Sequence, residues 1–245
     1  VGSEMCIRDS YVDYAHQCGL EVWALVDNFD QNVDDMELLS HTSSRENLEN
    51  QLVNAALQNG IDGINVDFEQ IPTDVGDHYI QFIRELSVLC RVNNLVLSVD
   101  NYVPKGYNTH YHREEQGVMA DYVIIMGYDE HYVGSDAGSV ASLSYERDGI
   151  TGTLENVPKE KIISGIPFYT RLWKTNASGE VSSEAIGMDK ADQILSDYKV
   201  TAGWSSETSQ DYAEFTDEDG NFCQIWLENE ASLSLIHISE PTRRS

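Results

Sequence analysis

The sequence predicts an α/β fold in which helices cover a parallel sheet. Segments with helical periodicity alternate with short apolar segments along residues 11–168. The apolar segments are hydrophobic on both faces, as in Tyr122–Met126 (YVIIM), which is typical of strands buried by helices. A chain of 245 residues, 41% of them hydrophobic, is long enough for one large domain or two small ones. None of the five strand-like segments precedes a GxGxxG motif, so a dinucleotide-binding sheet has no support.

The predicted elements alternate regularly up to residue 168. They are a helix at 11–18, a strand at 21–26, a helix from Ser43 to Gly60, a strand at 61–69, a helix around 79–90, strands at 95–99 and 122–126, a weak helix that Pro158 ends and a strand at 162–168. Ser43 and Glu46 have capping-box spacing, and Gly60 is a typical helix stop. The predicted buried face of this helix consists of Leu48, Leu52, Ala55 and Ala56.

The alternation stops after Arg171. One more helix is expected around 191–198, and two apolar segments at 212–216 and 221–227 flank Asp219-Gly220, which is a hairpin signal. Residues of about 172–232 are therefore expected to form a small α+β insertion after the last parallel strand.

Both ends of the chain differ in character from the rest. Residues 1–10 and 235–245 resemble translated sequencing-adapter sequence, so we expect artefactual ends around a domain at 11–234. The alternative is a genuine disordered tail.

The formal net charge of −27 limits the partners of this protein. Binding to nucleic acid is disfavoured, because it requires clustered Lys and Arg, and so is adhesion to an anionic membrane. No apolar run is long enough to span a bilayer. The cysteines lack metal-ligand spacing, so buried thiols are expected rather than a disulfide framework. His110 and His112 favour a surface or substrate-loop role over a metal site, and no metal or other cofactor is expected.

The strongest chemical signal lies in the strand at 61–69. Side chains alternate along a strand, so Asn65, Asp67 and Glu69 share one face while apolar residues occupy the other. The α-carbons of Asp67 and Glu69 are expected about 6–7 Å apart, close enough for their titrations to interact. One carboxylate can then keep its neighbour protonated, as a general acid near neutral pH requires. The alternative is a solvated acidic strand end.

Four segments in order resemble the motifs of glycoside hydrolase family 18, the chitinase family. Residues 62–69 (DGINVDFE) resemble DGxDxDxE, and 126–129 (MGYD) resemble M-T-Y-D. Residues 165–171 (GIPFYTR) resemble G-I-P-x-Y-G-R, and 226–232 (WLENEAS) resemble an aromatic-acidic segment with a Ser. The residues in these motifs are similar to those of the bacterial branch of the family that includes spore-cortex and cell-wall hydrolases.

This resemblance implies a (β/α)8 TIM barrel and a catalytic mechanism. Members of the family use substrate-assisted catalysis, in which the acetamido oxygen of the sugar attacks the anomeric carbon. Glu69 would be the catalytic acid, Asp67 would hydrogen-bond the acetamido N–H, and Tyr128 would hold the acetamido carbonyl. Asp129 and Arg171 would contact the substrate or support the site.

Three further residues are predicted near the sugar. Asn65 lies on the face that carries the two carboxylates, and Asn101 with Tyr102 follows the next predicted strand. Without the resemblance, Tyr128 fits a buried aromatic with a satisfied hydroxyl equally well, and Asp129 fits a loop residue.

The chain departs from the family pattern in three ways. Asn65 stands where many chitinases have Asp, so it cannot share a proton with Asp67. Gly127 replaces a frequent Thr, which is expected to have little effect. Strands one, two and eight of the barrel are expected to be missing, so this chain itself is expected to be inactive or impaired.

The sequence thus predicts retaining hydrolysis of β-glycosidic bonds after N-acetylglucosamine in peptidoglycan or chitin-type glycans. Two alternatives stay open, a non-catalytic glycan-binding relative and an inactive fragment. We expect a monomer in an extracellular, cell-wall or spore-associated location, inferred from the substrate class.

Overall fold

The computed structural model describes residues 2–30 and 32–239, with side chains described for 10–30 and 32–236. The chain forms two compact units. The first contains residues up to 124 together with 153–163, and the second contains 125–152 and the chain from 164 onward.

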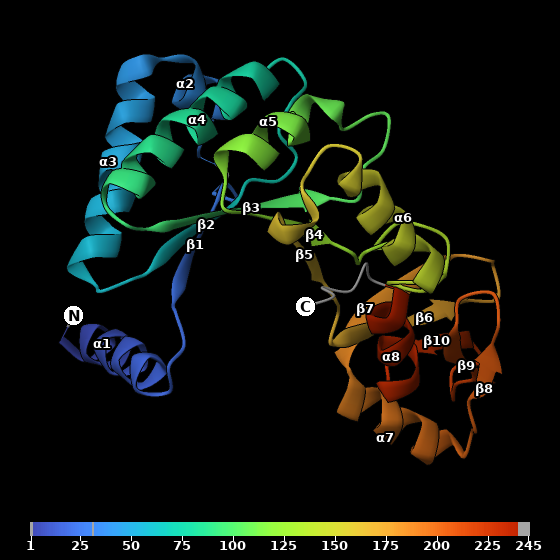
Figure 1. Cartoon of the computed structure of the whole chain (residues 1–245). Coiled ribbons are helices and arrows are strands. Elements are labelled where there is room, and N and C mark those ends of the chain that lie inside the picture. The colour runs from blue at the N-terminus through green and yellow to red at the C-terminus, as the bar shows by residue number, and fades with distance from the viewer. Residues whose placement is uncertain (1, 31, 240–245) are drawn as a thin grey trace. The chain divides into compact units, whose positions relative to one another are not determined.

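A parallel sheet of five strands forms the framework of the α/β fold (Figure 1). Its strands are β1 (Trp23–Asp27), β2 (Gly63–Asp67), β3 (Val96–Tyr102), β4 (Tyr122–Met126) and β5 (Ile162–Gly165), in this spatial order. β2 pairs in parallel with both β1 and β3. The five predicted strands are therefore confirmed, and consecutive strands are neighbours in the sheet.

Among the described residues of the first unit, five α-helices and one 3₁₀ helix precede β4. They are α1 (Gly2–Gln17), α2 (Asp35–Ser40), α3 (Thr42–Gln58), α4 (Gly76–Val92), the short 3₁₀ helix η1 (Thr109–Tyr111) and α5 (Arg113–Met119). Figure 1 shows α3, α4 and α5 on the same side of β2 and β3. Ile64, Val66 and Phe68 are buried there in one core with the apolar stripe of α4. Burial of this apolar stripe stabilises the unit.

One predicted feature of α3 is confirmed and two are wrong. Gly60 ends the helix as predicted, with a φ of 64° that favours glycine. The predicted capping box is wrong, because the N-cap is His41 and Ser43 already lies inside the first turn. The buried face is also rotated, since Val53 is buried whereas Ala55 is exposed.

Gly63 is required by close packing on the inner face of the sheet. The indole ring of Trp23 stacks on Tyr122 with 5.3 Å between ring centroids and lies over Gly63. A β-carbon at position 63 would lie 2.7 Å from Trp23 Cδ1 and 2.9 Å from Val96 Cβ. The sheet therefore has room for no side chain at this position.

Replacing Gly63 by alanine is expected to destabilise the protein. Overpacking of this kind costs about 1–2 kcal/mol, because ring and strand must both shift. Urea unfolding of Gly63→Ala would measure the loss, with Gly106→Ala as the control, since no atom lies within 4 Å of a β-carbon there. Equal midpoints for the two variants would contradict the prediction.

The second unit is built on an antiparallel sheet in the order β7-β6-β10-β9-β8. Its strands are β6 (Tyr169–Thr175), β7 (Val181–Gly187), β8 (Gly203–Ser205), β9 (Gln210–Thr216) and β10 (Phe222–Leu227), and its helices are α6 (Leu143–Leu154, which ends in the first unit), α7 (Met188–Tyr198) and α8 (Glu230–Ser239). The predicted hairpin of β9 and β10 is confirmed. The hairpin of β6 and β7 was not predicted, because β7 (VSSEAIG) is mostly exposed and gives no apolar signal.

A second core lies between this sheet and α7. It contains Ala191 and Leu195 from the helix, packed against Cys223, Ile225 and Leu227 of β10. The helix predicted around 191–198 is thereby confirmed. No described helix is long and apolar enough to cross a membrane.

Candidate active site

The polar face of β2 supplies the residues of the candidate site. Ile64, Val66 and Phe68 are buried on the helix side, whereas Asn65 and Asp67 on the other side are half-buried. Glu69 lies two residues after the end of the strand and is also half-buried. The predicted alternation is confirmed for this strand.

Glu69 is held at both its backbone and its side chain. The amide of Asn28, which follows β1, donates to the carbonyl oxygen of Glu69 and accepts from its N–H, each at 2.9 Å. The hydroxyl of Tyr102, at the end of β3, donates to Glu69 Oε2 at 2.6 Å. Asn28 after β1 therefore holds the Glu69 backbone, and Tyr102 of β3 holds its carboxyl group.

Asn28 was not predicted as a site residue. Its amide nitrogen also reaches Asp35 of α2, at 3.0 Å and 3.2 Å from the two carboxylate oxygens. The available signal was its place directly after the apolar strand β1, because parallel strands end at the same edge of a sheet.

Asp67 lies in an environment that disfavours its charge. Burial raises the pKa of its carboxyl group to about 6, and the charges of Glu69 and Asp27 add to the effect. Its Oδ1 atom is buried and has no hydrogen-bond partner among the described residues. Such an orphaned oxygen is suited to accept a hydrogen bond from a ligand.

Asn65 connects β2 to β3. Its amide nitrogen donates to Asp100 Oδ2 at 2.9 Å, and its oxygen accepts from the Ser98 hydroxyl at 2.6 Å. Burial raises the pKa of Asp100 to about 6; its hydrogen bond from Asn65 opposes this, and the charges of Asp67 and Glu69 strengthen it. Asp100 was not predicted as a site residue; the pairing of β3 with β2 brings it to this face, two residues after Ser98.

Tyr102 and Asn101 have different environments although they are adjacent. Tyr102 contacts Glu69, and burial followed by that hydrogen bond raises the pKa of its hydroxyl. Asn101 is only 1% exposed and donates at 2.6 Å to Gln116 of α5, on the opposite face of the sheet. The structure therefore corrects the prediction for Asn101, whose side chain joins β3 to α5 rather than facing a substrate.

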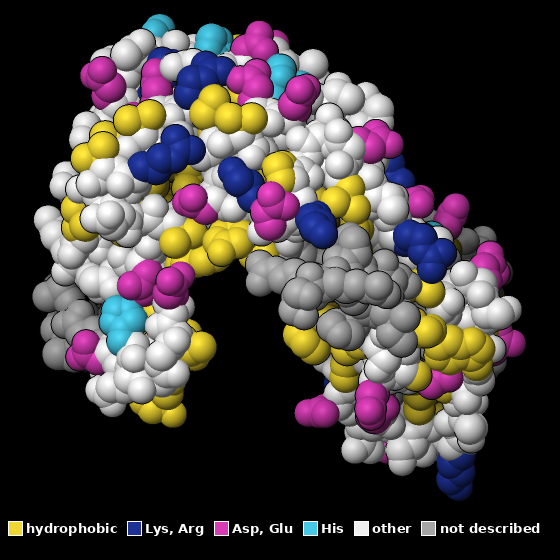
Figure 2. Space-filling view, in the orientation of Figure 1, with side chains coloured by type: hydrophobic (Ala, Val, Ile, Leu, Met, Phe, Trp, Pro, Cys, Tyr) yellow, Lys and Arg dark blue, Asp and Glu magenta, His cyan; other side chains and the backbone are white. Residues whose placement is uncertain are grey.

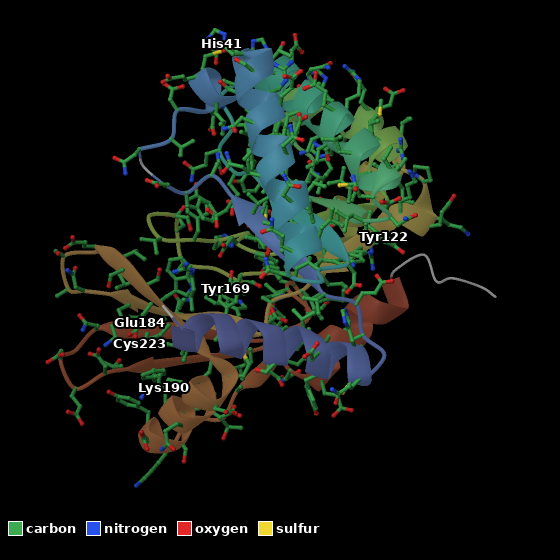
Figure 3. All side chains as sticks on the ribbon, turned by 90° about the vertical axis from the view of Figure 1, so that its left-hand side faces the viewer. His41, Tyr122, Tyr169, Glu184, Lys190 and Cys223 are labelled. Carbon is green, nitrogen blue, oxygen red and sulfur yellow. The ribbon has the colours of Figure 1, made fainter. Side chains whose placement is uncertain are left out.

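The second unit holds the other predicted site residues. Tyr169 at the start of β6, labelled in Figure 3, donates from its hydroxyl to Asp129 Oδ1 at 2.6 Å. Its ring packs edge-on against Tyr128, with 6.3 Å between centroids. Arg171 donates to the Ser183 hydroxyl at 3.2 Å across the β6–β7 pair. The structure thus brings Tyr128 and Asp129 together with Tyr169, which the sequence analysis did not single out.

Gly127 has a larger role than expected from the sequence. A β-carbon at this position would collide with the carboxyl group of Glu146, which is buried and accepts from the Ser164 hydroxyl at 3.0 Å. Glu146 therefore occupies the space that a side chain at position 127 would need.

A buried glutamate lies close enough to Glu146 to interact with its charge. Glu228 accepts hydrogen bonds from Gln210 and from Ser232, the latter at 3.1 Å. Burial raises its pKa to about 8, although the Ser232 bond opposes this, and the charge of Glu146 raises it further. The motif at 226–232 therefore anchors β10 and α8 inside the second unit.

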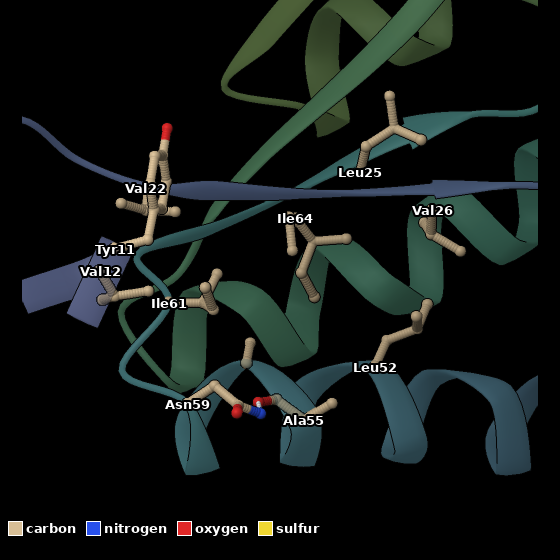
Figure 4. A pocket seen from close by; sticks show the side chains of 12 residues that line it. Tyr11, Val12, Val22, Leu25, Val26, Leu52, Ala55, Asn59, Ile61 and Ile64 are labelled. Atoms are coloured by element: carbon tan, nitrogen blue, oxygen red, sulfur yellow. Dashed lines mark hydrogen bonds between the residues drawn. The ribbon is translucent and has the colours of Figure 1, made fainter. Parts of the chain in front are cut away.

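An apolar pocket lies beside β1 in the first unit. It has a volume of about 740 Å³ and is lined by residues of α1, β1, α3 and β2, including Tyr11, Leu25 and Ile64 (Figure 4). β1 is the terminal strand of the described sheet there. None of the predicted site residues lines this pocket.

The described surface carries dispersed charge and no cluster of metal-ligating side chains. Acidic side chains are spread over the face shown in Figure 2, with Lys and Arg between them, rather than gathered in one patch. No group of three or more His, Cys, Asp or Glu side chains among residues with described side chains is arranged to hold a metal ion. Cys90 and Cys223 are buried free thiols, whereas Cys18 is exposed and Cys6 lies outside the described side chains.

The profile described as glycosyl hydrolases family 18 matches residues 23–235. The chain belongs to this family. The match includes both carboxylates of β2 and the Tyr128–Asp129 pair.

Relatives of this family-18 chain carry names from sporulation. YdhD of Bacillus subtilis, provisionally named a sporulation-specific glycosylase, is 27% identical over 202 residues, which cover 81% of this chain and 48% of YdhD. A Bacillus subtilis protein named cortical fragment-lytic enzyme is 25% identical over 205 residues, which cover 80% of this chain and 47% of that protein. The chain spans about half the length of these curated relatives.

Solved structures share the fold. The crystal structure of YdhD superposes with a TM-score of 0.87 at 25% identity, covering 94% of this chain and 80% of that one. The spore cortex-lytic enzyme SleL of Bacillus megaterium QM B1551 gives 0.82 at 20% identity, covering 93% and 56%. The family-18 α/β fold is thereby established.

Proposed function

We propose that this family-18 chain is the catalytic portion of a retaining glycosidase that hydrolyses β-glycosidic bonds after N-acetylglucosamine. Family membership supports glycoside hydrolysis in general. The observation that carries the finer proposal is the arrangement of Glu69 and Asp67 on one face of β2, with Glu69 bound by Tyr102 and Asp67 Oδ1 buried without a partner in the described chain.

Glu69 is proposed to act first as acid and then as base. It donates its proton to the leaving glycosidic oxygen while the acetamido oxygen of the sugar attacks the anomeric carbon. The glycosidic C–O bond breaks and a cyclic oxazolinium ion forms. In the second step the Glu69 carboxylate removes a proton from water, whose oxygen attacks the same carbon and reopens the ring. Two inversions leave the product with the β configuration of the substrate.

Asp67 is proposed to stabilise the cyclic intermediate. As a carboxylate it accepts a hydrogen bond from the acetamido N–H and offsets the positive charge that develops on the ring. Tyr128, Asp129 and Arg171 are assigned by motif position, Tyr128 as donor to the acetamido carbonyl and the other two as substrate contacts or supports. Asn65 and Tyr102 are proposed to position the two carboxyl groups.

The proposed substrates are peptidoglycan or chitin-type glycans, because both present N-acetylglucosamine. The name of the cortical fragment-lytic relative supports peptidoglycan of the spore cortex. A spore or cell-wall location is proposed on the same basis.

Release of a fluorescent aglycone tests the proposal. The protein is expected to cleave β-conjugates of N-acetylglucosamine or chitobiose and to leave the matching glucose conjugates intact, since these have no acetamido group. Proton NMR of the first product formed is expected to show the β anomer. Failure of the folded protein on both conjugates and on isolated spore cortex would favour the glycan-binding alternative, and an initial α product would exclude the retaining mechanism.

Replacing Tyr102 by phenylalanine is expected to lower kcat about tenfold with little change in stability. The variant removes a hydrogen bond to a carboxyl group, and such bonds contribute about 1.5–3 kcal/mol. Initial rates on the chitobiose conjugate would measure the loss, with Tyr14→Phe as the control because Tyr14 is exposed on α1. An unchanged kcat would show that the Tyr102 hydroxyl does not position Glu69.

A further inference from the structure

A polar pocket with a volume of about 390 Å³ lies within the second unit. Part of its lining comes from residues 130–144, which connect β4 to α6 and include the start of that helix. The rest comes from β8, β9, β10 and the turn between β8 and β9. Small-molecule sites typically have volumes of about 300–1,000 Å³. None of the predicted site residues is among the described residues that line this pocket.

An aromatic pair lines one part of the pocket. Tyr212 of β9 and Trp226 of β10 are partners across the two strands, with 4.8 Å between ring centroids, and both are partly exposed. The Tyr212 hydroxyl donates to Glu214 Oε2 at 2.7 Å and accepts from the Gln224 amide at 2.8 Å. The ring is therefore held in one orientation before any ligand binds. Such a preorganised pair offers an apolar surface at a low entropic cost of ordering.

His131 is fixed in place in another part of the lining. Its ring lies over Gly138, where a β-carbon would be 2.4 Å from Nδ1. Nδ1 lies 2.9 Å from the carbonyl oxygen of Ser139, which can only accept, so Nδ1 carries a proton. The Gly138 carbonyl accepts at 2.8 Å from the indole of the buried Trp173. This anchoring leaves the Nε2 atom of neutral His131 as an acceptor for a ligand.

Serine and threonine side chains also line the pocket, namely Ser139, Ser142, Ser144, Ser205 and Thr208. Hydroxyl groups both donate and accept hydrogen bonds. The Thr208 Oγ1 atom is buried and has no hydrogen-bond partner in the described chain. Polar atoms of this kind are usually satisfied by water or by a ligand group. The pocket therefore combines neutral hydrogen-bonding groups with an aromatic pair.

The charges at the pocket disfavour an anionic ligand. Glu130 and Glu207 line it, and no described Lys or Arg does. A phosphate or carboxylate group would be repelled by these two side chains. Attraction for a cation is weak, because Glu130 already accepts from the Ser142 N–H at 2.8 Å and Glu207 is exposed to solvent. A neutral ligand with many hydroxyl groups fits this lining best.

We propose that this pocket is a second saccharide-binding site, which holds one or two sugar rings of a glycan without cleaving it. A pyranose ring presents C–H groups on its faces and hydroxyl groups at its edge. The faces suit the Tyr212–Trp226 pair, and the edge suits His131 and the neighbouring hydroxyl side chains. That the sugar is N-acetylglucosamine rests on the proposed glycosidase function. Attachment at a second point keeps an enzyme on its polymer between cleavages.

Nitrogen-15 NMR of the tryptophan indole groups tests this site. The protein is Glu69→Gln, so that the ligand is not hydrolysed, and the probe is chitobiose. The indole resonance of Trp226, assigned by its absence in Trp226→Phe, is expected to shift and to saturate. Inorganic phosphate is expected to leave it in place. No shift with chitobiose, or a shift with phosphate alone, would overturn the proposal.

Filling the pocket from an exposed position tests where chitobiose binds. Ser144 is exposed at the start of α6, so Ser144→Tyr adds a ring to the lining without disturbing a core. Chitobiose affinity, followed at the Trp226 indole, is expected to fall at least tenfold. Asp192→Tyr places the same ring at an exposed position on α7 outside the lining, and its affinity is expected to stay within twofold. Equal affinities of the two variants would overturn the proposal.

Tyr128→Phe distinguishes this pocket from the site of the proposed reaction. It removes the hydroxyl assigned to the acetamido carbonyl and keeps the ring that packs against Tyr169. The Trp226 titration is expected to stay within twofold, and its loss would show that the pocket is not an independent site. A Trp226 shift in a protein that cleaves no glycan would support this inference and refute the glycosidase function alone. Turnover without a Trp226 shift would overturn the inference alone.

Discussion

Glu69→Gln is expected to lower kcat by about 10³-fold while glycan affinity stays within a few-fold of wild type. The amide keeps the size of the side chain and accepts the hydrogen bond from Tyr102. It carries no acidic proton for the leaving oxygen, and positioned acid–base groups contribute about 10²–10⁴-fold. Glutamine also cannot take a proton from water, so both steps of the reaction are impaired.

The measurement combines single-turnover kinetics on the chitobiose conjugate with calorimetric binding of a chitooligosaccharide. Asp192→Asn provides the control for handling and folding. Equal turnover of Glu69→Gln and wild type would contradict the assignment of Glu69. Binding by both proteins without turnover by either would favour the glycan-binding alternative.

Gly127→Thr is expected to lower the free energy of unfolding by about 3 kcal/mol. The new side chain would collide with the buried carboxyl group of Glu146, which must then move away from Ser164. Overpacking costs about 1–3 kcal/mol, and a buried group that loses its hydrogen bond costs about 1–3 kcal/mol more.

Urea unfolding with a double-mutant cycle would test this clash. Gly203→Thr is the control, since Gly203 lies in β8 with no atom within 4 Å of a β-carbon. In the Glu146→Ala background, Gly127→Thr is expected to cost at least 1 kcal/mol less than in wild type. Strict additivity would show that Glu146 is not what excludes a side chain at position 127.

The sequence predicted those features that depend on local periodicity. The side chains of β2 and the apolar stripe of α4 each repeat at a fixed interval, and the β9–β10 hairpin surrounds a turn signal. All three predictions are confirmed. The predicted start of α3 was wrong, because Ser43 and Glu46 have the spacing of a capping box although the helix begins at Thr42.

The hydrogen-bond partners of the site residues depend on how the strands pair, which a local sequence pattern does not specify. Asp100 and Asn28 reach the polar face of β2 through the registers of two different strand pairs. Asn101 was assigned to substrate together with Tyr102 because both follow the predicted strand at 95–99, but adjacent strand residues face opposite ways. The steric constraint on Gly127 also comes from a segment distant in sequence, since Glu146 lies on α6.

The order in which the compact units appear along the chain bears on folding during synthesis. Residues 153–163 complete the first unit, yet they follow residues 125–152, which belong to the second. At ribosomal rates of about 5–20 residues per second, residue 163 leaves the ribosome roughly 2–8 s after residue 124. During this interval the apolar side chains of β2, β3 and α4 belong to an unfinished nascent chain, which makes it a candidate client for chaperones that bind exposed hydrophobic segments.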